Sequence, residues 1–249
     1  MRRWTGSPGR RCASSSARPS SDRGDAPLRP WVSLALGGLA TALLLGAGPS
    51  GAVRVDDWES RQAGPLDLGG AWRTYPFYER PAFKQPPAIV VDDGRHALRL
   101  TTDNESARLG RALKVDLRRT PRLVWEWKPL VLPEGGDVRD RRRNDQAARV
   151  MVVFEGMKGI AYVWDTTAPV GAETQPDLFE IFQRVLIVVR SGPAGVGRWH
   201  RQTRDVAEDY RRVFGDEPRP TNFVGLEAHS NDTRSRSAAL FGAVYFEPR

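Results

Sequence analysis

The chain has 249 residues, 40% of them hydrophobic and 27% charged, so it can bury a full core within one domain. Its formal net charge of +8 overstates the basicity of the main part, because residues 1–52 hold seven Arg and two Asp and leave only +3 for the remainder. So small and scattered an excess argues against nucleic acid as a partner. The one dense basic run, residues 139–143, is interleaved with aspartates and is interpreted as a solvated loop.

The N-terminal part of the sequence has the features of an export segment. Residues 1–30 are rich in Arg, Ser and Pro and are predicted to be a disordered basic leader. Residues 31–52 then form the apolar region of a signal peptide, uncharged over residues 31–48, with Ser50-Gly51-Ala52 as the cleavage site. An uncleaved anchor is the alternative, because 18 apolar residues reach the lower limit of a membrane span. Residues 53–249 are therefore expected in the periplasm or another extracytoplasmic space, and attached to the inner membrane, through residues 31–48, only if that segment stays uncleaved.

The only cysteine, Cys12, lies before the apolar run. The exported part is therefore expected to have no disulfide and no thiol chemistry. A domain of this size can be stable without such bridges.

The exported part begins with short strand candidates. Residues 53–59 form the first, and the proline-rich stretch 60–88 is expected to be irregular or edge strand. Residues 88–101 predict a β-hairpin, because Asp93-Gly94 is a strong turn signal between two apolar runs. Further strands are expected at residues 107–115, 179–190, 197–203, 223–228 and 239–246.

The clearest alternation lies in residues 123–128, where Leu123, Trp125 and Trp127 would share a buried face. Residues 150–154 are apolar on both faces, which is typical of a central, covered strand. One helix is predicted after Asp205, with Gly215 at its C-terminal cap. The fold class predicted is all-β: a β-sandwich or jelly roll over residues 53–249, with one short docked helix.

The chain resembles a known family, domain-of-unknown-function family 3047 of bacterial envelope proteins. The resemblance rests on residues 120–128, 144–154, 161–164, 204–215 and 231–246, and covers roughly residues 53–247. The family usually shows two acidic residues where Asn144-Asp145 stand, and an Asp-rich loop where residues 229–232 stand. It carries no assigned activity, so the resemblance implies an architecture and not a chemistry.

Carboxylates supply the candidate catalytic groups. Glu126 and Asp145 are the pair considered for acid–base cleavage of a carbohydrate, which needs two carboxyl groups about 5–10 Å apart. The alternative for Asp145 is structural: if the chain turns at residues 146–147, Asp145 can pair with Arg149 and order the acidic loop against the sheet.

Metal and nucleophile signals are weak. The three histidines are far apart in sequence and the exported part has no cysteine, so no zinc site is predicted. Calcium is the one cofactor left open, with oxygens from Asn144, Asp145, Asn231 and Asp232, although no calcium-loop pattern is present.

Aromatic residues raise the question of sugar binding, because flat rings can bind sugars. Trp125 and Trp127 are assigned to the core, and Trp164, beside a long loop, is the candidate exposed platform.

The first functional hypothesis is a non-catalytic binding module for a glycan or similar polar envelope component. Its predicted ligand-binding residues are Asp137, Asp145, Arg149, Trp164, Asn231 and Asp232. The alternatives are a carbohydrate-active hydrolase or lyase, and a structural envelope protein whose sheet edges pair with a partner.

Overall fold

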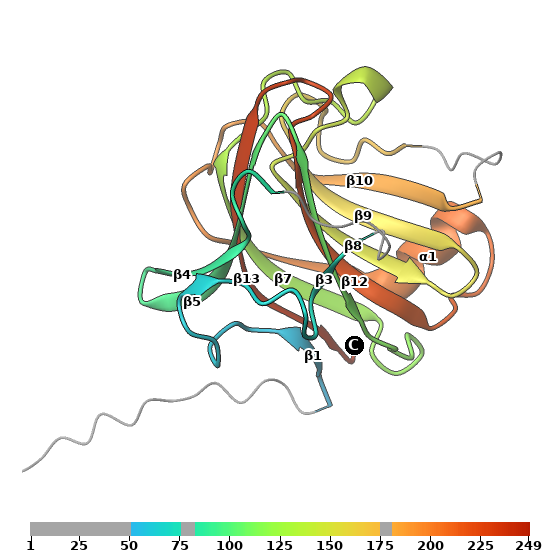
Figure 1. The fold of residues 1–249 in the computed structure, drawn as a ribbon. Coiled ribbons are helices and arrows are strands. Elements are labelled where there is room, and N and C mark those ends of the chain that lie inside the picture. The colour runs from blue at the N-terminus through green and yellow to red at the C-terminus, as the bar shows by residue number, and fades with distance from the viewer. Residues whose placement is uncertain (1–50, 76–82, 175–180) are drawn as a thin grey trace, which may run out of the picture. The chain divides into compact units, whose positions relative to one another are not determined.

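The computed structural model describes residues 51–75, 83–174 and 181–249 (Figure 1). Within these ranges it has thirteen strands, one 3-10 helix and one α-helix. Residues 1–50, which include the predicted leader and nearly all of the predicted signal or anchor segment, lie outside the described residues. Among the residues described, no helix is long and apolar enough to cross a bilayer.

The first sheet has seven strands in the order β11-β7-β13-β5-β4-β2, with β1 also paired to β13. Every strand pair in this sheet is antiparallel. The members are β1 Val53–Asp56, β2 Gly64–Pro65, β4 Ala88–Asp92, β5 Arg95–Asp103, β7 Arg122–Val131, β11 His200–Asp205 and β13 Arg236–Glu247.

The second sheet has six strands in the order β10-β9-β8-β12-β6-β3. The members are β3 Arg73–Thr74, β6 Ser106–Ala112, β8 Ala148–Phe154, β9 Lys158–Asp165, β10 Gln183–Ser191 and β12 Thr221–His229. β10 runs parallel to β9, unlike the other pairs. A parallel pair cannot be joined by a tight hairpin, so a longer connection separates these two strands in the sequence.

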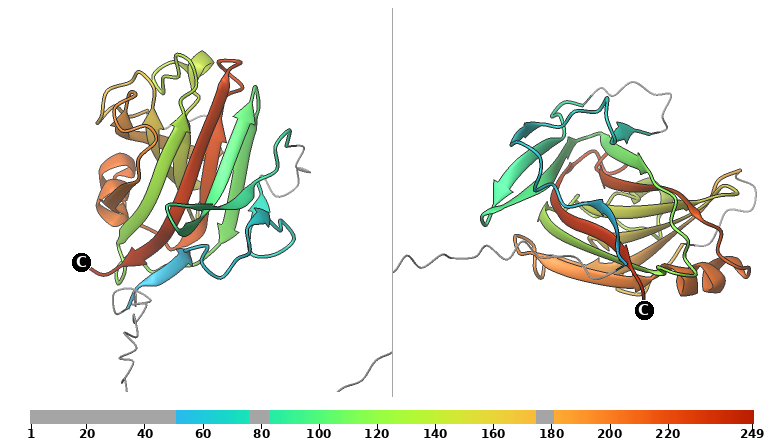
Figure 2. Two further views of the ribbon diagram at one scale, coloured as in Figure 1. Left: turned by 90° about the vertical axis from the view of Figure 1, so that its left-hand side faces the viewer. Right: turned by 90° about the horizontal axis from the view of Figure 1, so that it is seen from below.

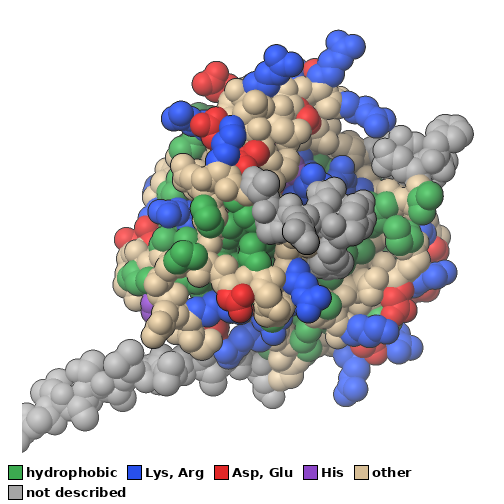
Figure 3. Space-filling model, in the orientation of Figure 1, with side chains coloured by type: hydrophobic (Ala, Val, Ile, Leu, Met, Phe, Trp, Pro, Cys, Tyr) green, Lys and Arg blue, Asp and Glu red, His purple; other side chains and the backbone are tan. Residues whose placement is uncertain are grey.

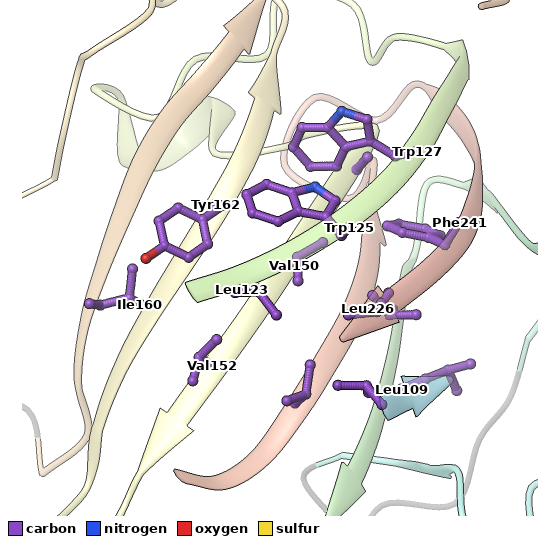
Figure 4. Packing of buried hydrophobic residues seen from close by; sticks show 14 of the residues in the cluster. Leu109, Leu123, Trp125, Trp127, Val150, Val152, Ile160, Tyr162, Leu226 and Phe241 are labelled. Carbon is purple, nitrogen blue, oxygen red and sulfur yellow. The ribbon is translucent and has the colours of Figure 1, made fainter. Parts of the chain in front are cut away.

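The two sheets pack face to face around the strand that the sequence singled out. In β7, Leu123, Trp125 and Trp127 are fully buried. Trp125 stacks on Tyr162 of the opposite sheet, with ring centroids 5.3 Å apart and planes 24° apart (Figure 4). β8 lies between β9 and β12 and is buried along its whole length. The predicted β-sandwich, its tryptophan face and its covered central strand are confirmed.

The hairpin and the helix follow their local signals. β4 and β5 pair directly, and the turn residues Asp93 and Gly94 adopt positive φ of 50° and 76°. Helix α1, Val206–Phe214, lies at one side of the sandwich (Figure 2). The side chain of Asp205 accepts the backbone N–H of Glu208 at 2.9 Å. Gly215 closes the helix in the left-handed region, as predicted.

The face of the six-stranded sheet that turns away from the central core is also largely covered. Met151, Val153, Ala161, Val163, Leu186 and Val188 form a second buried apolar cluster there with Val138 and Ala168. Over the side of the molecule drawn in Figure 3, basic and acidic side chains are interspersed rather than gathered by sign. Buried charged side chains also lie on this covered face, on β12 and β8 next to β6.

Candidate functional site

A row of charged side chains crosses the covered face of the six-stranded sheet. Arg149 of β8 is in register with Glu227 of β12, which is in register with Arg108 of β6. Side chains at registered positions of neighbouring strands point to the same face. Arg149 is 2% exposed and Glu227 is 0% exposed, so two ionisable groups lie side by side without access to water.

Arg149 is held mainly by the chain that leads into β8. Its Nε donates to Gln146 Oε1 at 2.5 Å, and its Nη2 donates to the carbonyl oxygen of Asn144 at 2.5 Å. Its Nη1 lies 3.7 Å from Glu227 Oε2, beyond hydrogen-bond distance. Burial lowers the pKa of Arg149 to about 9. The guanidinium is therefore fixed by neutral oxygens more than by its carboxylate neighbour.

Glu227 takes part in a chain of hydrogen bonds on its other side. The Tyr75 hydroxyl donates to Glu227 Oε1, and Glu227 Oε2 lies 2.5 Å from His229 Nε2. His229 Nδ1 lies 3.0 Å from Ser106 Oγ. Burial raises the pKa of Glu227 to about 8 and lowers the pKa of His229 well below its usual value. Both shifts favour the neutral form of each group.

Asp145 and the loop after β12 complete the cluster at the end of the sheet. Asp145 is fully buried, and its Oδ2 accepts from the backbone N–H of Thr233 at 2.7 Å and from the Thr233 hydroxyl at 2.8 Å. Its Oδ1 has no hydrogen-bond partner among the described residues. Burial and the charge of Asp145 raise the pKa of the more exposed Asp232. The structure therefore brings Asp145, Arg149 and Asp232 together, as predicted.

The prediction that Asp145 and Arg149 form an ion pair is wrong, because each side chain has other partners. Within the described part of the chain, Arg149 has a carboxylate within 4 Å only in Glu227. Asp145 holds the 230–235 loop through Thr233 instead. The turn between the two residues is present, because it places Asn144 and Gln146 around the guanidinium.

Asp137 lies beside this cluster and is buried. Its carboxylate binds Arg139 at 2.6 Å and the Thr167 hydroxyl at 2.9 Å, and the hydrogen bonds from Arg139 hold its pKa well below its usual range. The neighbouring Asp165, which sequence reasoning passed over, accepts from the backbone N–H groups of Val138, Thr167 and Ala168. The two aspartates tie the loops around residues 137 and 167 to the end of β9, which is a scaffolding arrangement.

Trp164 is not an exposed platform, and that prediction is wrong. Its side chain is 0% exposed, its ring meets Trp127 edge-on at 6.1 Å between centroids, and its Nε1 donates to the Gly192 carbonyl at 3.0 Å. Gly192 and His200, in the segment that follows β10, contact the ring, and Trp164 belongs to the core.

Glu126 and Asp145 are not assembled into an acid–base pair. Glu126 projects from β7 on the outer side of the seven-stranded sheet, between the buried Trp125 and Trp127. Asp145 precedes β8 in the other sheet and binds Thr233. Catalysis by these two carboxylates together therefore has no structural basis.

The side chains that were predicted to bind calcium do not form a metal site. Among the described residues, no group of three or more His, Cys, Asp or Glu is arranged to hold a metal ion. The amide nitrogen of Asn231 donates to Asp232 Oδ1 at 2.7 Å, so it presents a nitrogen where a calcium ligand needs an oxygen. The residues present do not fit a calcium ion.

Glu126 instead lines an open hollow of about 650 Å³ on the outer side of the seven-stranded sheet. Gly242 of β13 forms part of its wall. A Cβ at that position would lie 3.1 Å from Glu126 Cβ and 3.2 Å from the Trp199 ring. The β7–β13 register shifts between Phe241 and Val244, which is a bulge. The lining residues are Ala52, Arg54, Asp56, Asp57, Glu59, Arg95, His96, Glu126, Gly242, Ala243 and Tyr245.

Charges around this hollow are matched in pairs. Arg54 Nη1 lies 2.6 Å from Asp57 Oδ2, and Arg95 Nη1 lies 3.1 Å from Glu126 Oε2. His96 Nδ1 lies 3.4 Å from Glu59 Oε2. The fourth carboxylate of the lining, Asp56, is paired with Arg61 and Arg111, so each carboxylate at the hollow lies beside a basic side chain.

An aromatic ring borders the hollow beyond Gly242. The guanidinium carbon of Arg95 lies 4.4 Å from the centroid of the partly exposed Trp199, in a cation–π contact. Trp199 Nε1 donates to Asp92 Oδ2 at 2.7 Å, which fixes the ring. Trp199 was not predicted as a site residue, because its position next to Glu126 depends on the pairing of β11 with β7.

Several solved structures share part of the strand arrangement. The xyloglucanase domain of NopAA, a type three effector from Sinorhizobium fredii, is 11% identical, covers 75% of this chain and 98% of its own, and has a TM-score of 0.43. A family 12 xyloglucanase from Bacillus licheniformis is 7% identical, with 76% and 99% covered and a TM-score of 0.43. A carbohydrate-binding module, CBM28, is 12% identical, with 71% and 87% covered and a TM-score of 0.30. Similarities of this size carry no argument about activity.

Sequence comparison assigns the chain to a family. No curated protein matches it. One family model covers residues 71–245, more than half of the chain and most of the described β-sandwich. The chain therefore belongs to the family described as Protein of unknown function (DUF3047), as its sequence resemblance implied.

Proposed function

We propose that this protein is an exported, non-catalytic binding module, and that it holds an uncharged, hydroxyl-rich ligand such as a glycan in the hollow beside Glu126. The observation that carries the proposal is the pairing of opposite charges around that hollow. A hydroxyl group both donates and accepts hydrogen bonds, so it can bind next to either member of a pair. A charged ligand would meet a repelling group beside every attracting one.

The fixed ring of Trp199 and the side chain of Tyr245 add apolar surface to the same place. Arg201 Nη2 donates to the Tyr245 hydroxyl at 2.6 Å, which restrains that ring as well. Rings that are already fixed lose little conformational entropy on binding. This combination of rigid aromatic edges and paired charges supports a binding surface more than a catalytic one.

A hydrolase or lyase is the second candidate, and its specific support is that Glu59 and Glu126 line one hollow. Glu126 is paired with the Arg95 guanidinium, and Glu59 lies 3.4 Å from His96 Nδ1. A carbohydrate hydrolase of the usual kind needs one carboxyl group that stays protonated to act as an acid, and the guanidinium beside Glu126 opposes that. Binding is therefore preferred to cleavage.

Calorimetric titration of the exported protein with neutral and uronic-acid oligosaccharides tests the proposal. Neutral oligosaccharides are expected to bind, and Glu126→Gln is expected to weaken them about tenfold, because one charge-assisted hydrogen bond contributes about 1.4 kcal/mol or more. The matched control is Glu155→Gln, which breaks the surface pair with Lys114 away from the hollow. Binding of acidic oligosaccharides alone, or equal affinity in the Glu126→Gln variant, would contradict the proposal. Release of shorter sugars would favour the hydrolase.

Export is part of the proposal and has its own test. The basic leader, the apolar run and Ser50-Gly51-Ala52 together predict cleavage that leaves Val53 near the mature N-terminus. N-terminal sequencing of the protein recovered from the cell envelope should begin there. An intact chain that sediments with membranes would establish the uncleaved anchor instead.

A further inference from the structure

The orientation of the Asn231 amide group determines which atoms donate in a chain of hydrogen bonds on the six-stranded sheet. Asn231 Nδ2 donates to the carboxylate of Asp232 at 2.7 Å, so its Oδ1 is the atom that faces Ser106. An amide oxygen can only accept, and the Ser106 hydroxyl therefore donates its single proton to Asn231.

The hydrogen bond from Ser106 to Asn231 determines which ring nitrogen of His229 carries a proton. With its proton used, Ser106 Oγ can only accept from His229 Nδ1, which lies 3.0 Å away, so Nδ1 carries a proton. On the other side of the ring, 2.5 Å separates His229 Nε2 from Glu227 Oε2, and this contact also needs one proton. Exactly one further proton is thus shared by Glu227 and His229.

The surroundings place that proton on the carboxyl group. The charged side chains that act on the pair are Arg108 of β6, Arg149 of β8 and Arg184 of β10, with Asp145 and Asp232 acting on Arg149 from the loops. Burial disfavours both a carboxylate at Glu227 and an imidazolium at His229, and the three arginines disfavour the imidazolium further. The Tyr75 hydroxyl donates to the other oxygen of Glu227, so a proton on Oε2 leaves that contact in place. A protonated Glu227 that donates to a neutral His229 satisfies every contact.

We propose that Glu227, His229, Ser106 and Asn231 form a proton-controlled switch, in which loss of the proton shared by Glu227 and His229 reverses the hydrogen-bond chain and releases Asn231. Once the carboxyl gives its proton to water, His229 must donate from Nε2 to the carboxylate, and its remaining proton moves off Nδ1. Ser106 then donates to the bare Nδ1, and Asn231 Oδ1 loses its donor. The sheet interior is coupled in this way to the exposed loop at Asn231 and Asp232, independently of the hollow.

Side-chain ¹⁵N NMR of the three histidines tests the switch directly. At pH 6, His229 is expected as the neutral form protonated at Nδ1, and above about pH 8 as the form protonated at Nε2, because burial raises the pKa of Glu227 to about 8. His200 is an internal reference, since its Nε2 contacts the Gly195 carbonyl at 2.9 Å and must carry the proton. An Nε2-protonated His229 at pH 6, or an ordinary titration of its ring near its unperturbed pKa of about 6.5, would overturn the proposal.

Glu227→Gln provides the matched variant, because its amide keeps a donor toward His229 but cannot lose a proton in this range. The variant should hold His229 in the Nδ1-protonated form at all pH values measured, and a tautomer change that persists in it would refute the switch. Ser106→Ala, which cuts the chain at its surface end, should abolish any pH dependence of the amide-exchange protection factors at residues 231–235, that is, of the exchange rates after division by the intrinsic rates. If that pH dependence survives in Ser106→Ala, the coupling to the loop does not exist.

Melting temperatures give a second readout with a defined sign. The pKa of Glu227 is higher in the folded chain than in the unfolded chain, so its contribution to stability is complete below about pH 4.5 and is lost as the pH rises through about 8. The melting temperature of the wild type should therefore fall relative to Glu227→Gln over this range, by about 5 °C or more. A constant difference between the two proteins from pH 5 to 8 would contradict a protonated Glu227.

Discussion

Replacing Trp164 by alanine is expected to lower the free energy of unfolding by about 3–5 kcal/mol, as for other large-to-small changes in a core. The ring is fully buried and packs edge-on against Trp127 and His200, with centroids 6.1 Å and 5.0 Å away. Its removal also leaves the Gly192 carbonyl without the donor at 3.0 Å. Urea unfolding followed by far-UV circular dichroism measures the change.

Trp199→Ala is the control, because that ring is only partly buried and lies at the surface of the seven-stranded sheet. It should cost much less stability than Trp164→Ala while it weakens ligand binding in the hollow. The reverse order, with Trp164→Ala close to the wild type in stability, would restore the exposed platform that the sequence first predicted.

Trp125, Trp127 and Trp164 show which positions in the fold can be predicted from the sequence. Residues 123–128 alternate strictly, and alternation is a local property that survives in the folded sheet, so Trp125 and Trp127 were placed correctly in the core. Trp164 was predicted to be exposed because it lies at a strand end, next to Asp165 and a long loop. Asp165 is itself buried, because backbone N–H groups from residues 138, 167 and 168 surround its carboxylate. No local pattern reveals that Gly192 and His200, in the segment that follows β10, cover Trp164.

The strand order depends on pairing between distant segments, and the sequence predicted the strands better than their neighbours. The Asp93-Gly94 turn forces β4 and β5 together, since two residues leave no other path. The parallel pairing of β10 with β9 has no such signal, because the connecting residues 166–182 could reach either edge of the sheet.

The row of charged side chains on β6, β12 and β8 could have been predicted in part from the sequence, but it was not. In β12, Phe223, Gly225, Glu227 and His229 alternate with Val224, Leu226 and Ala228, which fill the core, so the first four belong to the other face. What the alternation cannot supply is the register that sets Glu227 between Arg108 and Arg149. The exposed Asn231 and Asp232 were predicted as site residues for their polarity, and the structure joins them to that row through Ser106.

Arg149→Ala should be the second large loss, about 3–5 kcal/mol in the free energy of unfolding, because a buried polar network loses one partner. Gln146 Oε1 and the Asn144 carbonyl would each lose a donor at 2.5 Å, and the space of a large side chain would be left empty. Arg143→Ala removes an exposed arginine that binds Asp140 at 3.0 Å, and as the control it should change stability by about 1 kcal/mol or less.

Arg149→Met separates the lost packing from the lost charge. Burial lowers the pKa of Arg149 to about 9, which means that the folded protein carries an unfavourable buried cation below that pH. Methionine keeps much of the volume and removes that charge, so it should restore part of the stability that alanine loses. Urea unfolding at pH 7 compares the three proteins. If methionine is as destabilising as alanine, the hydrogen bonds to Asn144 and Gln146 dominate, and if both variants match the wild type, Arg149 does not anchor the start of β8.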